Sequence, residues 1–109
     1  MDIFVFGSNL AGRHGAGSAR EAWLHWGAIR GQGVGLQGRS YAIPTKDVHL
    51  RILPISEIAK YVHEFLAHAA NSPNDMFHVV AIGCGLAGYH VDEIRPLFND
   101  RPENVKILW

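Results

Sequence analysis

Two glycine-rich segments of this chain have the composition of a phosphate-binding site. "RHGAGSA" at residues 13–19 and "IGCGLAGY" at residues 82–89 each follow an apolar run and precede a stretch with helical character. Glycine lets backbone N–H groups approach a ligand closely, and the start of a helix adds partial positive charge. A tight turn would explain either segment alone, because short glycine motifs often occur without a ligand. Two such segments together favour a cradle for a phosphate or diphosphate.

Lys46 is the candidate for covalent chemistry, at the end of the run "SYAIPTK" (40–46). Its amine would pair with a phosphate as a cation, or attack an electrophilic carbon when it is neutral. A plain exposed lysine is the competing interpretation. Cys84 lies between two glycines, and as a nucleophile it would need a nearby base and a lowered pKa. We therefore interpret Cys84 as a small loop residue.

The seven histidines do not predict a metal centre, because their spacing matches no zinc pattern. We expect no metal ligands and no cofactor. His14 and His90 adjoin the two glycine segments and could donate a hydrogen bond to a phosphate, but a solvated loop histidine is the favoured interpretation of each. Tyr89 is a candidate to stack on a ligand. Trp23 and Trp26 fit helix or core packing better than base stacking.

The elements that must position these residues alternate between strands and helices. Apolar, strand-forming runs predict strands at 3–6, 40–45, 77–82 and 104–109. Apolar residues at helical spacing predict helices at 16–26, 55–71 and 91–98. The glycine-rich stretch at 27–38 predicts a turn or hairpin without a helix, and Pro44 predicts the end or an edge of its strand.

This alternation predicts an α/β fold with a mostly parallel mixed sheet, formed by residues 1–109 as a single domain. Ligands of open α/β sheets bind at the carboxyl ends of the strands. Both glycine segments and Lys46 follow predicted strands. We therefore expect all three to meet at one edge of the sheet.

Composition limits the classes of partner. Charged residues make up only 18% of the chain and the formal net charge is zero, so no strongly basic face for nucleic acid is evident. No segment approaches the roughly 20 apolar residues that span a bilayer, and the first residues lack the basic character of a signal peptide. With a single cysteine, no disulfide can form within the chain. These features predict a cytoplasmic protein that does not associate with membranes.

The motifs resemble those of the macrodomain family, whose members bind ADP-ribose. "MDIFVFGSN" is similar to the macrodomain strand that ends in asparagine, and "HGAGSA" to the glycine-rich turn after it. "SYAIPTK" and "IGCGLAGY" are most similar to the branch that hydrolyses terminal ADP-ribose through a lysine. The resemblance runs from the first strand to "NVKILW" and implies an α/β/α sandwich. It also implies that the ligand is ADP-ribose, a related nucleotide derived from NAD, or an ADP-ribosylated macromolecule, including modified nucleic acid.

The resemblance also implies roles for individual residues. Asn9 would lie near the distal ribose, and Lys46 would attack its anomeric carbon. The two glycine segments would pass their backbones along the ribose and diphosphate, through Gly15, Ala16 and Gly17 on one side and Gly83, Cys84, Gly85, Leu86 and Ala87 on the other. The lysine branch often carries an acid where this chain has Ala87, and larger macrodomains have an earlier strand whose loop contacts adenine. Two functions therefore stay open: an ADP-ribosyl hydrolase acting through Lys46, and a binding module without chemistry.

Overall fold

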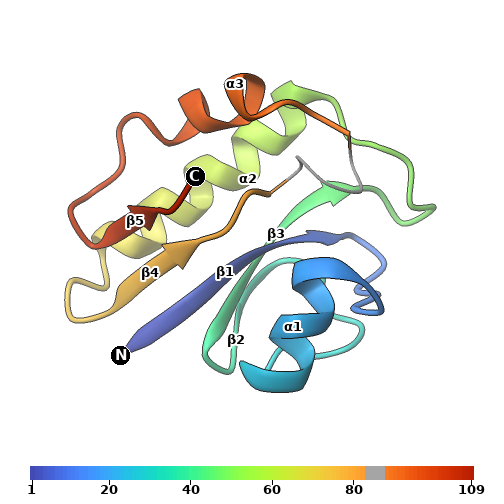
Figure 1. Cartoon of the computed structure of the whole chain (residues 1–109), viewed down its shortest axis with the longest axis horizontal. Coiled ribbons are helices and arrows are strands. Elements are labelled where there is room, and N and C mark those ends of the chain that lie inside the picture. Colours follow the sequence, from blue (N-terminus) through green and yellow to red (C-terminus); the bar gives the residue numbers. More distant parts are fainter. Residues whose placement is uncertain (83–87) are drawn as a thin grey trace.

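The computed structural model of the chain is shown in Figure 1 and describes residues 1–82 and 88–109. Four helical segments in this described part of the chain lie against the sheet: α1 (Gly17–His25), α2 (Ile55–Ala70), α3 (Val91–Ile94) and the 3₁₀ helix η1 (Arg95–Phe98). No helix within these described residues is long and apolar enough to cross a membrane.

The strands form a five-stranded sheet in the order β2-β3-β1-β4-β5. The central strand β1 (Asp2–Asn9) pairs in parallel with β3 (Ser40–Lys46) and with β4 (Met76–Val79). At one edge β5 (Val105–Ile107) pairs in parallel with β4, and at the other β2 (Gly35–Gln37) pairs antiparallel with β3. The predicted α/β class with a mostly parallel mixed sheet is confirmed.

Helices cover both faces of the sheet because the side chains of β1 alternate between two cores. Ile3 and Val5 belong to the larger core, formed with α2, α3 and η1. Phe6 belongs to the smaller core, on the side of α1, and Phe4 packs against that core. Figure 1 shows α1 on the opposite side of the sheet from α2 and α3. The four consecutive residues 3–6 of β1 therefore all pack in or against a core, which fixes the strand whose carboxyl end leads to the first glycine segment.

Several boundaries differ from those predicted. The first strand extends to Asn9, past Gly7 and Ser8, because β3 continues to pair with it there. The helix predicted at 91–98 is one turn of α-helix followed by η1, because Pro96 has no N–H to continue the α-helical hydrogen bonds. The prediction of a turn or hairpin region without a helix at 27–38 is correct: its last residues form β2, which makes a hairpin with β3.

Pro44 lies where only one side of β3 is paired. The antiparallel partner β2 reaches only Ala42, and residues 52 and 53 contact this side of β3 only at Thr45 and Lys46, so Pro44 lies in the unpaired stretch between them. The other side of β3 continues to pair with β1, with Pro44 opposite Ser8. Proline is tolerated at such an edge because the missing N–H costs no bond in the ladder. The prediction of an edge position is confirmed.

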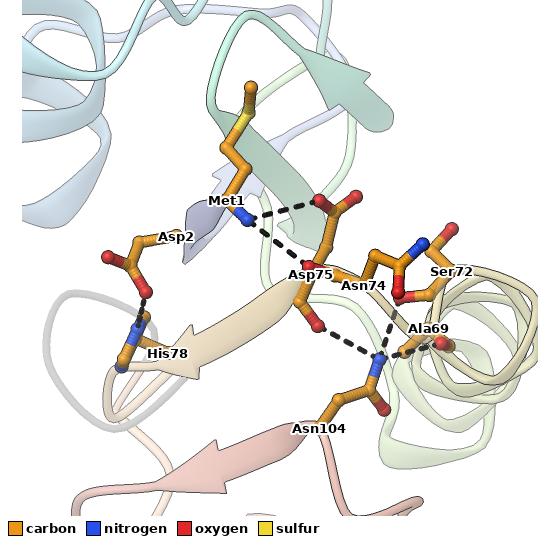
Figure 2. Close-up of polar contacts among 8 residues, drawn as sticks. All are labelled: Met1, Asp2, Ala69, Ser72, Asn74, Asp75, His78 and Asn104. Carbon is orange, nitrogen blue, oxygen red and sulfur yellow. Dashed lines mark hydrogen bonds and ion pairs between the residues drawn. The ribbon is translucent and has the colours of Figure 1, made fainter.

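A cluster of polar contacts closes the amino-terminal end of the sheet (Figure 2). The Asn104 amide nitrogen lies within hydrogen-bond distance of three carbonyl oxygens, those of Ala69 and Ser72 at 2.9 Å and of Asp75 at 3.1 Å. These carbonyls belong to the end of α2 and to the turn before β4. A single side chain thereby joins α2, β4 and the start of β5.

Candidate functional site

A cavity of about 510 Å³ lies at the carboxyl ends of β1, β3 and β4. This is the edge of the sheet at which the sequence predicts a site. The described residues that line the cavity come from the three strand ends, the loop after β1 and the first turns of α1; they are residues 7–9, 13, 15–19, 45, 46, 50 and 80–82.

The cavity brings together most of the predicted site residues that the structure describes. Asn9, Gly15, Ala16, Gly17 and Lys46 all line it. The second glycine segment was predicted through Gly83, Cys84, Gly85, Leu86 and Ala87, and these lie outside the described residues. The described chain leading to that segment, residues 80–82, forms one wall of the cavity.

Tyr89 is described, and it lies away from the cavity wall. Its hydroxyl donates a hydrogen bond to the Leu53 carbonyl oxygen at 2.6 Å. Its ring packs against the larger core. The side chain therefore links the segment before α3 to the segment before α2.

The glycines around the first segment divide into two kinds. A Cβ added at Gly33 would lie 2.0 Å from the Asn9 carbonyl oxygen, and one added at Gly12 would lie 2.3 Å from the Gly31 carbonyl carbon. These glycines let the chain after β1 pack directly against the segment 27–38. Gly15 is different, because an added Cβ would meet no protein atom within 4 Å and its φ is outside the left-handed region. Neither packing nor backbone conformation requires glycine there.

The Asn9 side chain organises the loop that follows β1. Its amide nitrogen donates to the Arg13 carbonyl oxygen, and its amide oxygen accepts from the Arg13 N–H, both at 2.9 Å. The Gly12 N–H donates to the Asn9 carbonyl oxygen at 3.0 Å. These bonds fix the backbone of Arg13 beside the cavity. Arg13 was not predicted as a site residue, although its place beside "HGAGSA" and its anion-binding side chain were available signals.

His14 is buried, with 1% of its surface exposed, so the interpretation as a solvated loop histidine is wrong for this residue. Its Nε2 lies 3.1 Å from the Gln32 carbonyl oxygen and 3.3 Å from the Gln37 side-chain oxygen, which also accepts from the Ile29 N–H. Both partners are acceptors, so Nε2 carries the hydrogen. The ring also packs edge-on against Phe6. The histidine joins the first glycine segment to the segment 27–38; His90, by contrast, is exposed as predicted.

Lys46 lies beside Asn9, because the two residues are paired in the ladder between β3 and β1. The Leu10 N–H donates to the Lys46 carbonyl oxygen at 2.9 Å. Its half-buried side chain lines the cavity, and within residues 1–82 and 88–109 its ammonium group makes no hydrogen bond or ion pair. The amine is therefore available to a ligand from the described side of the cavity.

A short loop returns the chain from Lys46 to an isolated bridge at Ile52. The Asp47 carboxylate accepts hydrogen bonds from the backbone N–H groups of His49 at 2.8 Å and of Arg51 at 2.9 Å. The bond from Arg51, and then that from His49, holds the pKa of the Asp47 carboxyl below its ordinary value. The loop places Leu50 on the cavity wall.

The described lining of the cavity is positively charged. Arg13 and Lys46 line it, and no aspartate or glutamate does so among the described residues. The whole chain carries no net formal charge, so this is a local concentration of cations. A site of this kind attracts anions such as phosphate.

The remaining predicted candidates have other positions. Trp23 packs against the smaller core, and Trp26 stacks on Phe4 with ring centroids 5.3 Å apart, so both have the packing role expected of them. The described residues contain no group of three or more His, Cys, Asp or Glu side chains arranged to hold a metal ion.

Comparison with known proteins adds information on the fold. No family model matches the sequence, and no curated protein matches it. The structure is similar to that of a protein of unknown function from Bacteroides thetaiotaomicron, with a TM-score of 0.65 and 16% sequence identity. The match covers 98% of this chain and 87% of that chain. At this level of identity the likeness shows a shared fold and nothing about the ligand.

Proposed function

We propose that this protein binds ADP-ribose or a related NAD-derived nucleotide in the cavity at the carboxyl ends of β1, β3 and β4. Two cationic side chains, Arg13 and Lys46, suit the diphosphate. After Arg13, residues 15–17 present mostly backbone to the cavity, as diphosphate cradles commonly do. The ribose and adenine parts of the ligand are inferred from the resemblance of the motifs to macrodomains.

The observation that carries the proposal is the glycine at position 15. Gly15 lines the cavity, yet the protein itself has room for a side chain there. Glycine costs conformational entropy on folding, so a glycine that the fold does not need calls for another cause. Close approach of a ligand to the backbone is such a cause.

Calorimetric titration of the Gly15→Ala variant tests the proposal. We expect the wild type to bind ADP-ribose with about micromolar affinity or better and to show no comparable binding of ATP. Gly15→Ala should remain folded and gain about 0.4–1 kcal/mol in free energy of unfolding, because alanine restricts the unfolded chain. Its affinity for ADP-ribose should fall at least about tenfold, since the methyl group displaces the ligand from the backbone.

Gly33→Ala is the matched control. Its Cβ would lie 2.0 Å from the Asn9 carbonyl oxygen, so the free energy of unfolding should fall. The protein that remains folded should bind ADP-ribose with nearly wild-type affinity. A wild type that binds neither ADP-ribose nor related derivatives would refute the proposed ligand. A Gly15→Ala variant with wild-type affinity would show that this loop is only a turn.

A second candidate function is hydrolysis of an ADP-ribosyl bond through Lys46. The observation that favours it is the amine on the cavity wall without a bonding partner among the described residues. The Nζ lone pair would form a bond to the anomeric carbon, and the bond from that carbon to the attached group would break. The attached group would leave with the proton that the Lys46 nitrogen gives up when its bond to carbon forms. Opening of the sugar would give an imine, which water would hydrolyse to release the free amine.

A further inference from the structure

Leu50 has a backbone conformation that leucine rarely adopts. Its φ is 62°, and it is the non-glycine residue with positive φ in the described part of the chain. The left-handed region is unfavourable for a residue with a Cβ, because that atom crowds the following carbonyl oxygen. Such strain persists only where the surrounding structure enforces it, and it is frequent where a side chain acts on a ligand.

The loop from Lys46 to Ile52 enforces this conformation. Two backbone N–H groups that flank Leu50, those of His49 and Arg51, donate to the Asp47 carboxylate. The Leu50 N–H donates to the Asp47 carbonyl oxygen at 3.1 Å, and the Asp47 N–H donates to the Arg51 carbonyl oxygen at 2.8 Å. Asp47 therefore holds both sides of the strained residue.

Burial in the core does not compensate for the strain. The Leu50 residue is 40% exposed and belongs to neither hydrophobic core. It does line the cavity, together with Lys46 from the same loop. The side chain is thus held where a ligand would cover it.

We infer that Leu50 is a specificity-determining residue that packs against the terminal sugar of the ligand; this inference rests on the proposed function. The carbon face of a ribose is apolar enough to be covered by a leucine. Leu50 lines the same cavity as Lys46 and comes from the loop that begins there, so it would lie at the sugar end of the ligand if the Lys46 amine meets the anomeric carbon, as in the second candidate function. Leu50 would then favour ligands that carry a sugar beyond the diphosphate over those that end in phosphate.

Competition binding of ADP-ribose and ADP to the Leu50→Gly variant tests this role. Glycine tolerates positive φ, so the thermal midpoint should stay at or above that of the wild type. Affinity for ADP-ribose should fall about tenfold, the expected loss for partial burial of a leucine, while affinity for ADP should not change. The preference for ADP-ribose over ADP would therefore fall by the same factor.

Val48→Gly is the matched control, since Val48 is exposed on the same loop and does not line the cavity. It should lower the thermal midpoint and leave the preference unchanged. If Leu50→Gly lowers the affinity for ADP-ribose and for ADP equally, or lowers neither, the role of Leu50 is refuted and the proposed function is unaffected. A wild type that binds neither ADP-ribose nor ADP would refute both the role of Leu50 and the proposed function.

Discussion

Lys46 has two possible roles that predict different behaviour in a variant. As a cation bound to phosphate, its removal should weaken binding by roughly 1.5–3 kcal/mol, the usual contribution of a charged hydrogen bond. As a nucleophile, its removal should cost turnover far more than affinity. We expect Lys46→Ala to bind ADP-ribose and to lose hydrolysis of an ADP-ribosylated substrate. Borohydride should trap the wild type on its ligand and fail to trap the variant.

Lys46→Arg separates charge from nucleophilicity, because the guanidinium keeps the positive charge and forms no imine. If hydrolysis is real, this variant should bind with nearly wild-type affinity and still be inactive. A wild type without trapping or turnover on ADP-ribosylated DNA, protein or small nucleotides would leave binding as the function. Full activity in Lys46→Ala would assign the chemistry to another group.

The sequence could predict the identity of several cavity residues but not how each side chain is used. Asn9 was found through the resemblance of "MDIFVFGSN" to macrodomains, and Lys46 because it follows a predicted strand; in the structure each ends its strand. The bonds between the Asn9 amide and the backbone of Arg13 could not be predicted, since they depend on the loop geometry. The burial of His14 was missed for a similar reason: its partners, Gln32 and Gln37, lie in the segment 27–38, which packs against it in space.

Whole elements were more predictable than their ends. α2 was evident because its buried residues, Ile58, Val62, Phe65 and Ala69, recur at helical spacing. β2 was expected only as part of a hairpin, because Gly35 and its neighbours carry no strand signal of their own. This strand forms because β3 offers it a free edge. Pairing with β3 thus makes these residues a strand, although their local propensity does not predict one.

The loop after Lys46 should depend on pH through Asp47. The backbone N–H groups of Arg51 and His49 lower the pKa of the Asp47 carboxyl below 3.8. Because the folded pKa is depressed, the carboxylate stabilises the loop above the unfolded value of about 3.9, and this contribution is lost as the pH falls through the folded value. We expect the His49 and Arg51 amide resonances to shift together below pH 3.8 in an NMR titration.

Asp47→Asn retains an oxygen that accepts both bonds and cannot ionise, so those resonances should stay constant over the same range. A shared midpoint at or above 3.8 in the wild type would contradict the bonded arrangement of this loop.

Across the whole molecule, the contacts of Asn104 lie at the opposite end of the sheet from the cavity. Its amide bonds to the carbonyls of Ala69, Ser72 and Asp75 join α2 to two strands (Figure 2). Asn104→Ala should lower the free energy of unfolding by about 1–3 kcal/mol, because partly buried carbonyls lose their donor. Affinity for ADP-ribose should not change. Urea unfolding monitored by tryptophan fluorescence measures the first effect, and calorimetry the second.

Asn71→Ala is the matched control, because it removes the same amide group from a side chain that makes fewer hydrogen bonds. The Asn71 amide makes one side-chain bond, to the Ala67 carbonyl oxygen at an exposed site, so its loss should cost less than about 1 kcal/mol. Equal destabilisation by the two substitutions would argue against a special role for Asn104. A loss of affinity in Asn104→Ala would show that the two ends of the sheet are coupled.

The short outer strands have a consequence for how this protein meets its neighbours in a crowded solution. An exposed sheet edge is a template for the strand of another chain, and long flat edges promote aggregation. Here β2 and β5 are each three residues long, and Lys106 lies in the middle of β5. Where β2 ends, the uncovered part of β3 contains Pro44, which has no N–H to offer. An incoming strand would find few consecutive hydrogen-bond partners at either edge, so edge-to-edge pairing between copies of the chain is disfavoured.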